Sequence, residues 1–521
     1  LGAMELITGL SLLAQLFALG YMEKDWALAR FFALMGFFQG AMSGLAISDS
    51  LFLSYALLEM LTLSTYLLVG FWYAQPLVVT AARDAFLTKR VGDVLLLMGV
   101  VALASLSGSL NFPDLYAWAE TTTLTPTAAT LLGLSLIAGP TGKCAQVPLH
   151  LWLDEAMEGP NPASILRNSV VVACGAYVLI KLQPILALSP VALTTLIVLG
   201  TITAIGTSLV AIAQIDIKRT LSHSTSAYLG LVFIALGTQR TGFALLLLLT
   251  HAIAKALLFM SVGSVIATTN CQNVTELGGL WSRMPATSSA FVVGGAGLVG
   301  LVPLGGFWAL QQGIDIFWIE QPWLVPVWLL VNGLTALNLT RVYRLVFLGQ
   351  PQPKTRRAPE VPWSMAVPMV SLTIVTLLVP AMLQRLTLVP LDWGYFSRVQ
   401  VLALVLSGLA GCSIGATIYL HKAWSRSVYL PSRVLQDWLA YDFYIDRLYR
   451  LTFVLAVNLI SRCSAWFDRY VVDGLVNGVG LASIFSGESL KYSLTGQSQT
   501  YLLTIFVSVG FLGVLLTWSM W

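Results

Sequence analysis

Three ionisable side chains lie deep inside apolar runs, where a charge is costly. Glu59 lies in LFLSYALLEMLTLSTYLLVG, about 12 Å from the nearer end of its helix at a rise of about 1.5 Å per residue. His251 and Lys255 are four residues apart in LLTHAIAKALLF and therefore share one helix face. A charge at the centre of a membrane helix costs about 2.5–3.5 kcal/mol on insertion scales, and such residues are usually paired and functional. The pattern predicts a relay for cations, and for protons in particular.

Each of these residues also has a structural interpretation. Glu59 can be a protonated carboxyl group hydrogen-bonded to Thr62 on the same helix face, and Lys255 can be a structural lysine paired to a carboxylate. We favour the relay because Lys255 lies about 18 Å from the start of its segment, too deep for its ammonium group to reach the membrane surface easily.

Three more charged residues lie nearer the predicted helix ends. Lys143 lies in GPTGKCAQVP and is either at the membrane surface or at a buried site. Asp93, in KRVGDVLLLMG, can cap its helix or pair with Arg90. Arg167, after GPNPAS, alone indicates an interfacial anchor. No catalytic Ser/His/Asp set, paired-carboxylate site or phosphate loop is found in the sequence. Acidic groups inside the apolar runs are few, which disfavours transport of metal ions or organic substrates.

The composition excludes most classes of soluble protein. Of the 521 residues, 57% are hydrophobic and only 10% are charged, whereas a soluble domain has about 25% charged residues. The apolar runs last about twenty residues, so they predict membrane-spanning helices and exclude the alternating strands of a barrel. The net charge of +4 is too small to argue for nucleic acid binding. The five cysteines form no CxxC pair and indicate neither disulfides nor a metal site.

The apolar runs predict about fourteen membrane spans. Their approximate bounds are 1–20, 30–48, 51–73, 91–109, 127–148, 163–184, 190–212, 220–238, 243–267, 287–316, 323–349, 361–384, 400–420 and 499–521. Basic residues recur in loops separated by an even number of spans, so these loops lie on one side, which the positive-inside rule makes cytoplasmic. The four basic clusters are Arg83, Lys89 and Arg90; Lys218 and Arg219; Arg341, Arg344, Lys354, Arg356 and Arg357; and Lys422, Arg426 and Arg433.

Two spans contain helix breakers at matching positions. These are GPTGKCAQVP (139–148) and GLVPLGGFWALQQG (300–313), each in the fourth span of a five-span block. Paired breaks of this kind indicate an internal repeat with ion sites at discontinuous helices. Charges every few residues across 425–495 instead predict a long amphipathic helix lying along the membrane face or against other subunits.

We therefore expect an all-α membrane protein with six regions. They are a remnant of N-terminal helices whose upstream part is missing (1–29), a first repeat (30–184), a second repeat (190–349), additional membrane helices (361–421), a lateral amphipathic helix region (425–498) and a C-terminal membrane anchor (499–521).

The segments GPTGKCAQVPLHLWLDEAMEGPNPAS, DIKRTLSHSTSAYLG and LLTHAIAKALLF resemble the antiporter-like subunits of respiratory and photosynthetic complex I. The lateral helix and last span further resemble the distal F-type subunit (NdhF) of the NAD(P)H-quinone oxidoreductase of cyanobacteria and chloroplasts. The resemblance implies inverted five-helix repeats and a proton-translocating role in a quinone oxidoreductase. It implies no redox centre in this chain. Plastoquinone and iron–sulfur clusters are expected in partner subunits, bound lipids are possible ligands, and a D-type antiporter-like subunit is expected as a neighbour along the lateral helix.

The resemblance also assigns roles to the charged residues. Glu59 and Lys143 correspond to the charge pair of the first half-channel, with Asp93 as a nearby carboxylate. His251 and Lys255 correspond to the central polar axis of the second half. The proton relay is completed by Arg167, which lies where the family usually has a histidine linking the two halves. Asn168 takes that place if the one-residue gap falls differently.

Departures from the family pattern point to one branch. Leu310 and Gln311 replace the Lys–Asp pair expected to release protons, and Leu247 stands where a second histidine is frequent. With the KCAQ, LDEAMEGPNP and LRN segments, these changes resemble the cyanobacterial CO2-uptake isoform. That isoform implies a thylakoid ferredoxin–plastoquinone oxidoreductase with a Cup-type CO2-hydration protein on its cytoplasmic face. The relay would then remove the proton released as CO2 becomes bicarbonate.

Three alternatives remain open. One is a cation/proton antiporter subunit of the Mrp type, whose large subunits share the motifs. Another is the ordinary F subunit for respiration and cyclic electron flow in photosynthesis, and the last is a structural anchor with a vestigial relay. Co-isolation with hydrophilic iron–sulfur subunits would favour a complex I assignment, and sodium-dependent growth rescue would favour the antiporter.

Overall fold

The computed structural model describes residues 1–389, 398–418 and 433–518. The chain divides into two compact units, Leu1–Phe443 and Tyr444–Trp521. Nearly all the described residues are helical, and their β-structure consists of two isolated bridges, Ser50–Asn111 and Asp216–Asn273. The predicted all-helical class is confirmed.

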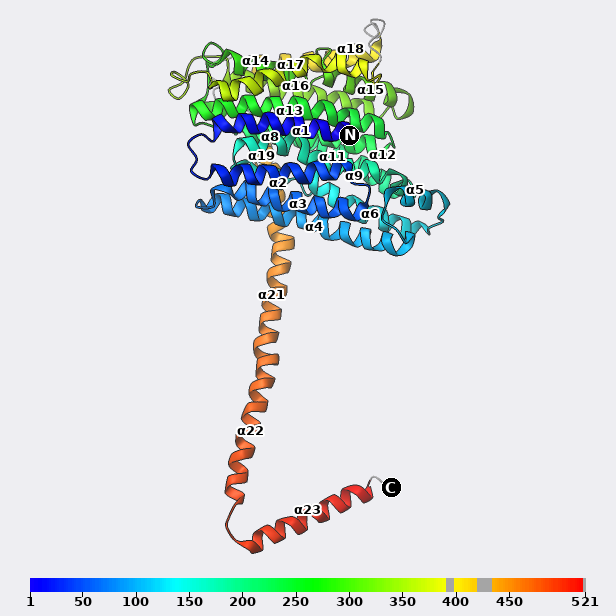
Figure 1. Cartoon of the computed structure of the whole chain (residues 1–521), viewed down its shortest axis with the longest axis vertical. Coiled ribbons are helices and arrows are strands. Elements are labelled where there is room, and N and C mark those ends of the chain that lie inside the picture. Colours follow the sequence, from blue (N-terminus) through cyan, green and yellow to red (C-terminus); the bar gives the residue numbers. More distant parts are fainter. Residues whose placement is uncertain (390–397, 419–432, 519–521) are drawn as a thin grey trace. The chain divides into compact units, whose positions relative to one another are not determined.

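The first unit is a bundle of long helices that run side by side (Figure 1). Its helices are α1 (Gly2–Tyr21), α2 (Leu28–Ile47), α3 (Leu51–Val69), α4 (Pro76–Ser107), α5 (Phe112–Thr121), α6 (Pro126–Lys143), α7 (Leu151–Glu155), α8 (Asn161–Leu166), α9 (Val172–Lys181), α10 (Gln183–Leu186), α11 (Pro190–Ala213), α12 (Ile217–Gly237), α13 (Thr241–Thr269), α14 (Pro285–Ala296), α15 (Gly305–Glu320), α16 (Leu324–Val346), α17 (Trp363–Arg385), α18 (Val399–Ile418) and α19 (Arg433–Ala440).

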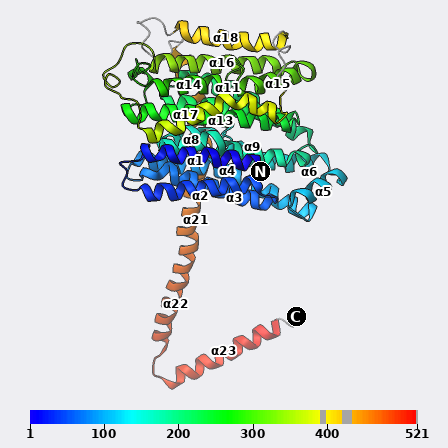
Figure 2. The ribbon, with the colours of Figure 1, turned by 45° about the horizontal axis from the view of Figure 1, so that its top comes forward.

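Helix α13 lies at the centre of this bundle. It contacts α1, α8, α12, α14, α15 and α17, and it lies between α2 and α3 on one side and α16 and α18 on the other in both views (Figure 2). Most of its side chains are buried. A helix that is apolar on every face is stable only when protein or lipid surrounds it, so the most enclosed position goes to the helix that bears His251 and Lys255.

Within the described residues, twelve helices are long and apolar enough to cross a membrane. Three predicted spans are not among them: 127–148, 220–238 and 287–316. The first and third contain the predicted breaks, and the second corresponds to α12, whose lower hydropathy follows from its buried Ser, Thr, His and Lys residues.

Both predicted breaks are present. Helix α6 ends at Lys143, and the chain turns through Ala145, whose φ is 49°, before α7 begins. Helix α14 ends at Ala296, and α15 begins at Gly305. A Cβ on Gly306 would collide with the carbonyl oxygen of Gly297, so the second break depends on backbone-to-backbone contact.

Several basic residues expected in loops lie in helices instead. Arg83, Lys89 and Arg90 are inside α4, which begins at Pro76, ahead of the predicted span 91–109. Arg341 is near the end of α16, where its buried guanidinium donates to the carbonyl oxygen of Ala211 at 3.2 Å. Arg344 lies in the last turn of the same helix. The presence of basic residues did not predict loops correctly here, because a long basic side chain can reach a partner from within a helix. Lys422 and Arg426 lie outside the described residues.

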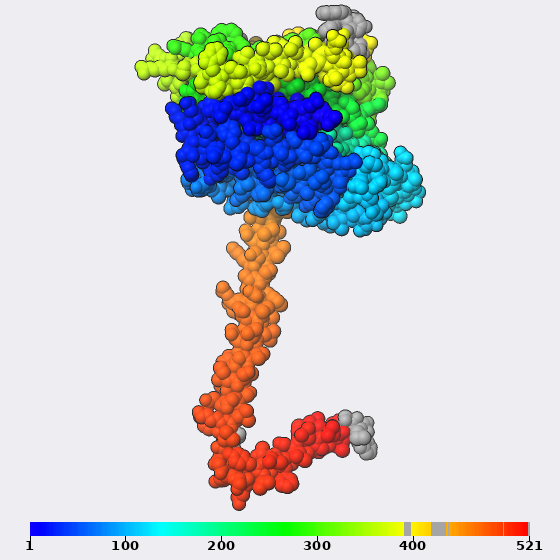
Figure 3. Space-filling model, viewed as in Figure 1, coloured from blue at the N-terminus to red at the C-terminus, as the bar shows by residue number. Residues whose placement is uncertain are grey.

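The second unit is a long helical run followed by a separate helix. Its segments are α20 (Ile445–Tyr449), a π-helical turn (Arg450–Val454), α21 (Leu455–Phe467), a π-helical turn (Asp468–Val472), α22 (Asp473–Ser493) and α23 (Ser498–Trp518). Residues 445–493 are helical over most of the predicted lateral region, and α23 covers most of the predicted last span. The run Asp442–Tyr492 is itself one of the twelve helices long and apolar enough to cross a membrane, so its lateral position stays a prediction. No described helix of this unit covers α21 or α22 (Figure 3), and their apolar side chains are exposed. The predicted boundaries within the first unit stay a prediction.

Candidate functional site

A buried cluster joins Lys143 to two carboxylates from different helices. The Lys143 Nζ lies 2.7 Å from Asp93 Oδ1 and 3.6 Å from Glu59 Oε1. It also donates to the carbonyl oxygen of Leu58 at 3.2 Å and to the hydroxyl of Thr62. The Asp93 side chain is 0% exposed and that of Lys143 is 5% exposed. Paired charge is the usual way for an ionised group to be tolerated at such depth.

Glu59 has a second cation on its outer side. Its Oε2 forms an ion pair with Arg90 of α4, one turn from the cluster. The Glu59 side chain is 20% exposed and that of Arg90 is 36% exposed. The carboxylate of Glu59 therefore bridges the more exposed guanidinium of Arg90 and the buried ammonium of Lys143. Two structural interpretations from the sequence are wrong: Glu59 does not depend on Thr62, and Asp93 pairs with Lys143 instead of Arg90.

Small residues allow α4 and α6 to approach closely enough for these contacts. A Cβ on Gly92 would lie 2.5 Å from the carbonyl oxygen of Ala138, and one on Gly139 would lie 2.6 Å from the side chain of Leu96. Because Lys143 is the last residue of α6, the break leaves its side chain free to extend towards α3 and α4. The sequence left Lys143 between a surface and a buried position, and the structure buries it.

Lys89 is a buried cation that the sequence analysis had placed in a loop. Its Nζ lies 3.5 Å from the centroid of the Trp152 ring, at the distance of a cation–π contact. The Trp152 indole donates to the carbonyl oxygen of Gly142 at 2.7 Å. The ring thus connects Lys89 to the last turn of α6. The sequence feature that could have indicated this buried cation is its position directly before Arg90 and four residues ahead of Asp93.

His251 and Lys255 form a second group on α13. The Lys255 Nζ donates to the carbonyl oxygen of Leu221 on α12 at 3.0 Å, and no carboxylate forms an ion pair with it in the described part of the chain. The His251 ring stacks on Tyr228, with ring centroids 5.0 Å apart, and neither of its nitrogens has a hydrogen-bond partner. Both side chains are fully buried. The paired-carboxylate interpretation of Lys255 is therefore wrong.

Arg167 is buried and begins a π-helical turn, Arg167–Val171. Its NH1 donates to the carbonyl oxygen of Ala156 at 2.6 Å, whereas Nε and NH2 have no hydrogen-bond partner. The interfacial position suggested by the sequence is wrong, because the side chain is 0% exposed. Asn168, the alternative occupant of this place, donates to the carbonyl oxygen of Ser164.

The six predicted residues therefore form a cluster, a pair and a single residue. Glu59, Asp93 and Lys143 are in direct contact. Among the described residues, no hydrogen bond or ion pair joins this cluster to His251 and Lys255 or to Arg167. The proton relay predicted from the sequence is therefore not continuous from side chain to side chain, and its gaps require water or motion.

The second break has an altered polar group. Leu310 is buried, and Gln311 donates to Asp315 Oδ1 at 3.0 Å. Asp315 lies one turn beyond the position at which the family's Lys–Asp pair was expected. This half retains a carboxylate near the break, but the expected lysine is absent from its position.

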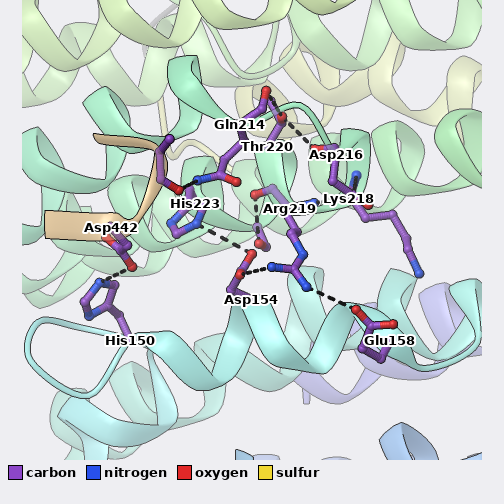
Figure 4. A network of polar contacts seen from close by, with 12 residues as sticks. His150, Asp154, Glu158, Gln214, Asp216, Lys218, Arg219, Thr220, His223 and Asp442 are labelled. Carbon is purple, nitrogen blue, oxygen red and sulfur yellow. Dashed lines mark hydrogen bonds and ion pairs between the residues drawn. The ribbon is translucent and has the colours of Figure 1, made fainter. Parts of the chain in front are cut away.

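A further polar network, missed by the sequence analysis, lies beside the first break (Figure 4). Its contacts are His150 Nε2 to Asp442 Oδ2 at 2.8 Å, His223 Nε2 to Asp154 Oδ1 at 3.6 Å, Arg219 NH1 to Asp154 Oδ2 at 2.9 Å, and Arg219 NH2 to Glu158 Oε1 at 3.1 Å. Asp154 lies in α7, outside the membrane spans. Its pKa is raised to about 7 by burial, with Arg219 opposing the rise.

No group of three or more His, Cys, Asp or Glu residues in the described part of the chain has the arrangement of a metal site. The ionisable groups can bind and release protons. Lys143 is at the end of α6, whereas Glu59, Asp93, His251 and Lys255 lie within α3, α4 and α13. Such an arrangement is suited to proton transfer between fixed side chains.

Comparison with known proteins identifies the family. Residues 48–335 match the model of the NADH:quinone oxidoreductase/Mrp antiporter membrane domain, and residues 1–32 match the N-terminus of complex I chain 5. The chain is 63% identical to NAD(P)H-quinone oxidoreductase subunit 5 of the Paulinella chromatophora chromatophore, over 99% of this chain and 84% of that protein. It is 32% identical to the chloroplast subunit 5 of Chaetosphaeridium globosum, over 96% and 83% of the two chains.

A solved structure shares the fold. The archaeal membrane-bound sulfane sulfur reductase, a respiratory membrane complex, contains a chain that superposes with a TM-score of 0.66 at 20% identity, covering 79% of this chain and 82% of that one. This likeness supports the fold alone. The sequence matches together show that the chain belongs to the subunit 5 (NdhF) family of NAD(P)H-quinone oxidoreductase, as an antiporter-like membrane subunit.

Proposed function

We propose that this subunit conducts protons across the membrane through Glu59, Asp93 and Lys143, with Arg167, His251 and Lys255 continuing the path. The observation that carries this proposal is the buried ammonium of Lys143 held between two carboxylates. A structural ion pair requires one partner, whereas a relay requires a donor within reach of two acceptors.

The geometry of Glu59 suggests how transfer is controlled. Its two carboxylate oxygens face different cations, Arg90 on the more exposed side and Lys143 on the buried side. A guanidinium stays charged, whereas an amine can lose its proton. When Lys143 gives up its proton, Glu59 retains Arg90 as a partner, so the carboxylate is never left unpaired.

The second group is suited to hold a proton temporarily. Among the described residues, Lys255 has only a carbonyl oxygen as hydrogen-bond partner, and the two buried ring nitrogens of His251 have none. Buried polar groups normally have partners, including ordered water. Water between these groups and the Lys143 cluster would complete the path that the side chains leave open.

We further propose that the complex belongs to the CO2-uptake branch. Arg167 places a permanent charge where a titrating histidine is usual in the family, and it is buried with two free donor nitrogens. With Leu310 in place of a lysine, proton release through the second half is weakened. Protons from CO2 hydration by a Cup-type protein on the cytoplasmic side would then move through Arg167, Lys143 and Glu59.

The surrounding assembly follows from the same proposal. Ferredoxin-driven plastoquinone reduction at iron–sulfur clusters in other subunits would supply the free energy in a thylakoid membrane. The exposed apolar side chains of α21 and α22 are suited to pack against a D-type neighbour or lipid. The match of 63% over nearly the whole chain to a quinone oxidoreductase subunit favours this assignment over an Mrp-type antiporter.

Purification and growth test the proposal together. Gentle detergent extraction should co-isolate the chain with iron–sulfur subunits and a CO2-hydrating protein; recovery with cation-antiporter subunits alone would contradict it. Glu59→Gln should abolish growth at limiting CO2, because the mobile carboxylate is lost, while Glu23→Gln, in an exposed loop, should grow normally. Unchanged CO2 uptake in Glu59→Gln would rule out its role.

A further inference from the structure

Four titratable side chains outside the relay gather beside the break that follows α6. His150 lies in the break itself, Asp154 is in α7, His223 is in α12, and Asp442 comes from the far end of the first unit. They form two His–Asp contacts, at 2.8 Å for His150–Asp442 and 3.6 Å for His223–Asp154 (Figure 4). The two contacts thus join residues that belong to different elements of the fold.

The exposed fraction of the side chain decreases from Arg219 to Asp154 and from Asp154 to His223. Arg219 is 32% exposed, Asp154 is 17% exposed and His223 is 5% exposed. Asp154 Oδ2 is bound by Arg219, but Oδ1 has no hydrogen bond and faces His223. Asp154 can therefore exchange a proton with outside water through the network's exposed edge and with His223 on its inner side.

Most of the other charged groups around Asp154 have partners of their own. Glu158 shares Arg219 with Asp154. Asp216 accepts the backbone N–H groups of Lys218 and Arg219 at the start of α12. The Lys218 ammonium donates to the carbonyl oxygens of Met157 and Gly159. Glu155, next to Asp154 in α7, is acted on by the charges of Asp154 itself, Arg219 and Glu158. With its pKa near 7, Asp154 changes protonation in the physiological range.

Gln146 connects this group to the relay. Its Nε2 donates to the carbonyl oxygen of Ser226, one turn beyond His223 on α12, at 3.2 Å, and to that of Cys144, which follows Lys143, at 2.9 Å. Its Oε1 is buried and has no hydrogen-bond partner among the described residues. The buried hydroxyl of Ser224 has none there either. Buried polar atoms without protein partners are the usual sites of ordered water.

We propose that His150, Asp154, His223 and Asp442 form a proton-exchange site that passes protons between outside water and Lys143 through water held at Gln146. Inward transfer breaks an O–H bond at Asp154 and forms an N–H bond at His223. His223 then gives its proton to the water at Gln146 Oε1, which gives one to the neutral amine of Lys143. Asp154 regains a proton from outside water, so Asp154 and His223 return to their starting states. Lys143, now an ammonium, returns to its own when it passes a proton on to Glu59.

Asp442 acts as a positioning residue in this scheme. His150 Nδ1 lies 3.3 Å from the carbonyl oxygen of Pro148 and Nε2 faces Asp442, so the carboxylate holds the ring in place. Burial disfavours the protonated form of His223, and the negative charge of Asp442 partly opposes that effect as the proton passes. The site is complete only when the segment ending in Asp442 is docked on the bundle. Gln214 supports that docking by donating to the carbonyl oxygen of Ala440 at 3.3 Å.

This inference rests on the proposed proton path and extends it outwards. It is tested in the intact complex, reconstituted in vesicles, by measuring protons moved per quinone reduced over a range of pH. His223→Gln should lower proton transfer by about 100-fold, the lower end of what a positioned proton donor contributes. Asp154→Asn should do the same, and Asp154→Glu should restore transfer with a shifted pH profile. Asp442→Asn should keep partial transfer but shift the pH profile, because it acts through the histidines.

Asp114→Asn provides the control, because the exposed carboxylate of Asp114 binds Ser109 and contacts none of the residues of this site; it should transfer protons normally. If Asp154→Asn prevents assembly, the test relies on His223→Gln, because this variant keeps the Asp154–Arg219 ion pair. Normal proton transfer and an unchanged pH profile in His223→Gln would overturn the exchange site. If Lys143→Met stops transfer in the same vesicles, the relay itself stands; if Lys143→Met also transfers normally, the proposed function fails.

Discussion

The ammonium of Lys143 lies 2.7 Å from the carboxylate of Asp93 and 3.6 Å from that of Glu59. The nearer partner is fully buried on α4, and the more distant one, on α3, is partly exposed and shared with Arg90. Lys143 is thus held by one carboxylate and within reach of another. This asymmetry makes the two acidic residues unequal, and it allows their roles to be separated by substitution.

Substituting Asp93→Asn should damage both stability and proton transfer. Removing one partner of a buried ion pair costs about 3–5 kcal/mol, because the remaining charge is left uncompensated. Thermal unfolding of the purified complex should show the loss, and vesicle assays should show slower proton transfer. Asp114→Asn, at an exposed site where the carboxylate binds Ser109, is the control. Equal behaviour of the two variants would contradict the assignment of Asp93.

Gly92→Ala should disturb the site without changing any charge. The added Cβ would lie 2.5 Å from the carbonyl oxygen of Ala138, so α4 and α6 must separate. Overpacking of this kind costs about 1–3 kcal/mol, and it would pull Asp93 away from Lys143. Proton transfer should fall, while Gly36→Ala, where a Cβ has open space, should have little effect. Undiminished transfer in Gly92→Ala would show that the distance between the two helices is not critical.

Lys89→Met should show whether Lys89 is a structural cation or a proton carrier. Its only described partner is the ring of Trp152, and an apolar replacement of similar length avoids burying a charge. We expect assembly and thermal stability to be maintained or improved. Since no carboxylate contacts Lys89, proton transfer should stay within about twofold of wild type, in contrast to changes at groups that transfer protons directly. A loss comparable with that of Lys143→Met would place Lys89 in the relay.

Asp154 should make the stability of the assembled protein depend on pH. Its pKa rises from an ordinary 3.8 to about 7 in the folded state, so the folded state holds a proton that the unfolded state releases. Its stabilising contribution is complete below 3.8 and is lost as the pH rises towards 7. Thermal midpoints measured across this interval should fall less steeply with pH for Asp154→Asn than for wild type. Parallel curves would contradict the raised pKa.

The sequence was sufficient for the features that depend on local pattern. Long apolar runs predicted the helices, and the spacing of His251 and Lys255 predicted their shared position on α13. The breaks around Lys143 and Gly305 were visible because Gly and Pro interrupt apolar segments at matching places. These features follow from backbone hydrogen bonding and helical periodicity, which act over a few residues.

The remaining features depend on contacts between distant segments. The pairing of His150 with Asp442 joins residues that lie far apart in the sequence of the unit, and no local pattern marks it. The sequence offered Arg90 as one possible partner of Asp93 because the two are close together in the chain, whereas Arg90 pairs with Glu59 of α3. Arg167 was placed at the surface because the depth of a helix that follows a break cannot be read from its composition. In each case tertiary packing decided the partner.

The most direct measurement is the number of protons moved per quinone reduced by the intact complex carrying Lys143→Met, reconstituted in sealed vesicles. Methionine keeps the length and apolar stem of lysine but cannot hold a proton, and Lys24→Met, in an exposed loop, controls for loss of charge. We expect quinone reduction to continue with the proton yield clearly reduced in Lys143→Met and unchanged in Lys24→Met. An undiminished proton yield in Lys143→Met would contradict a proton path through this residue.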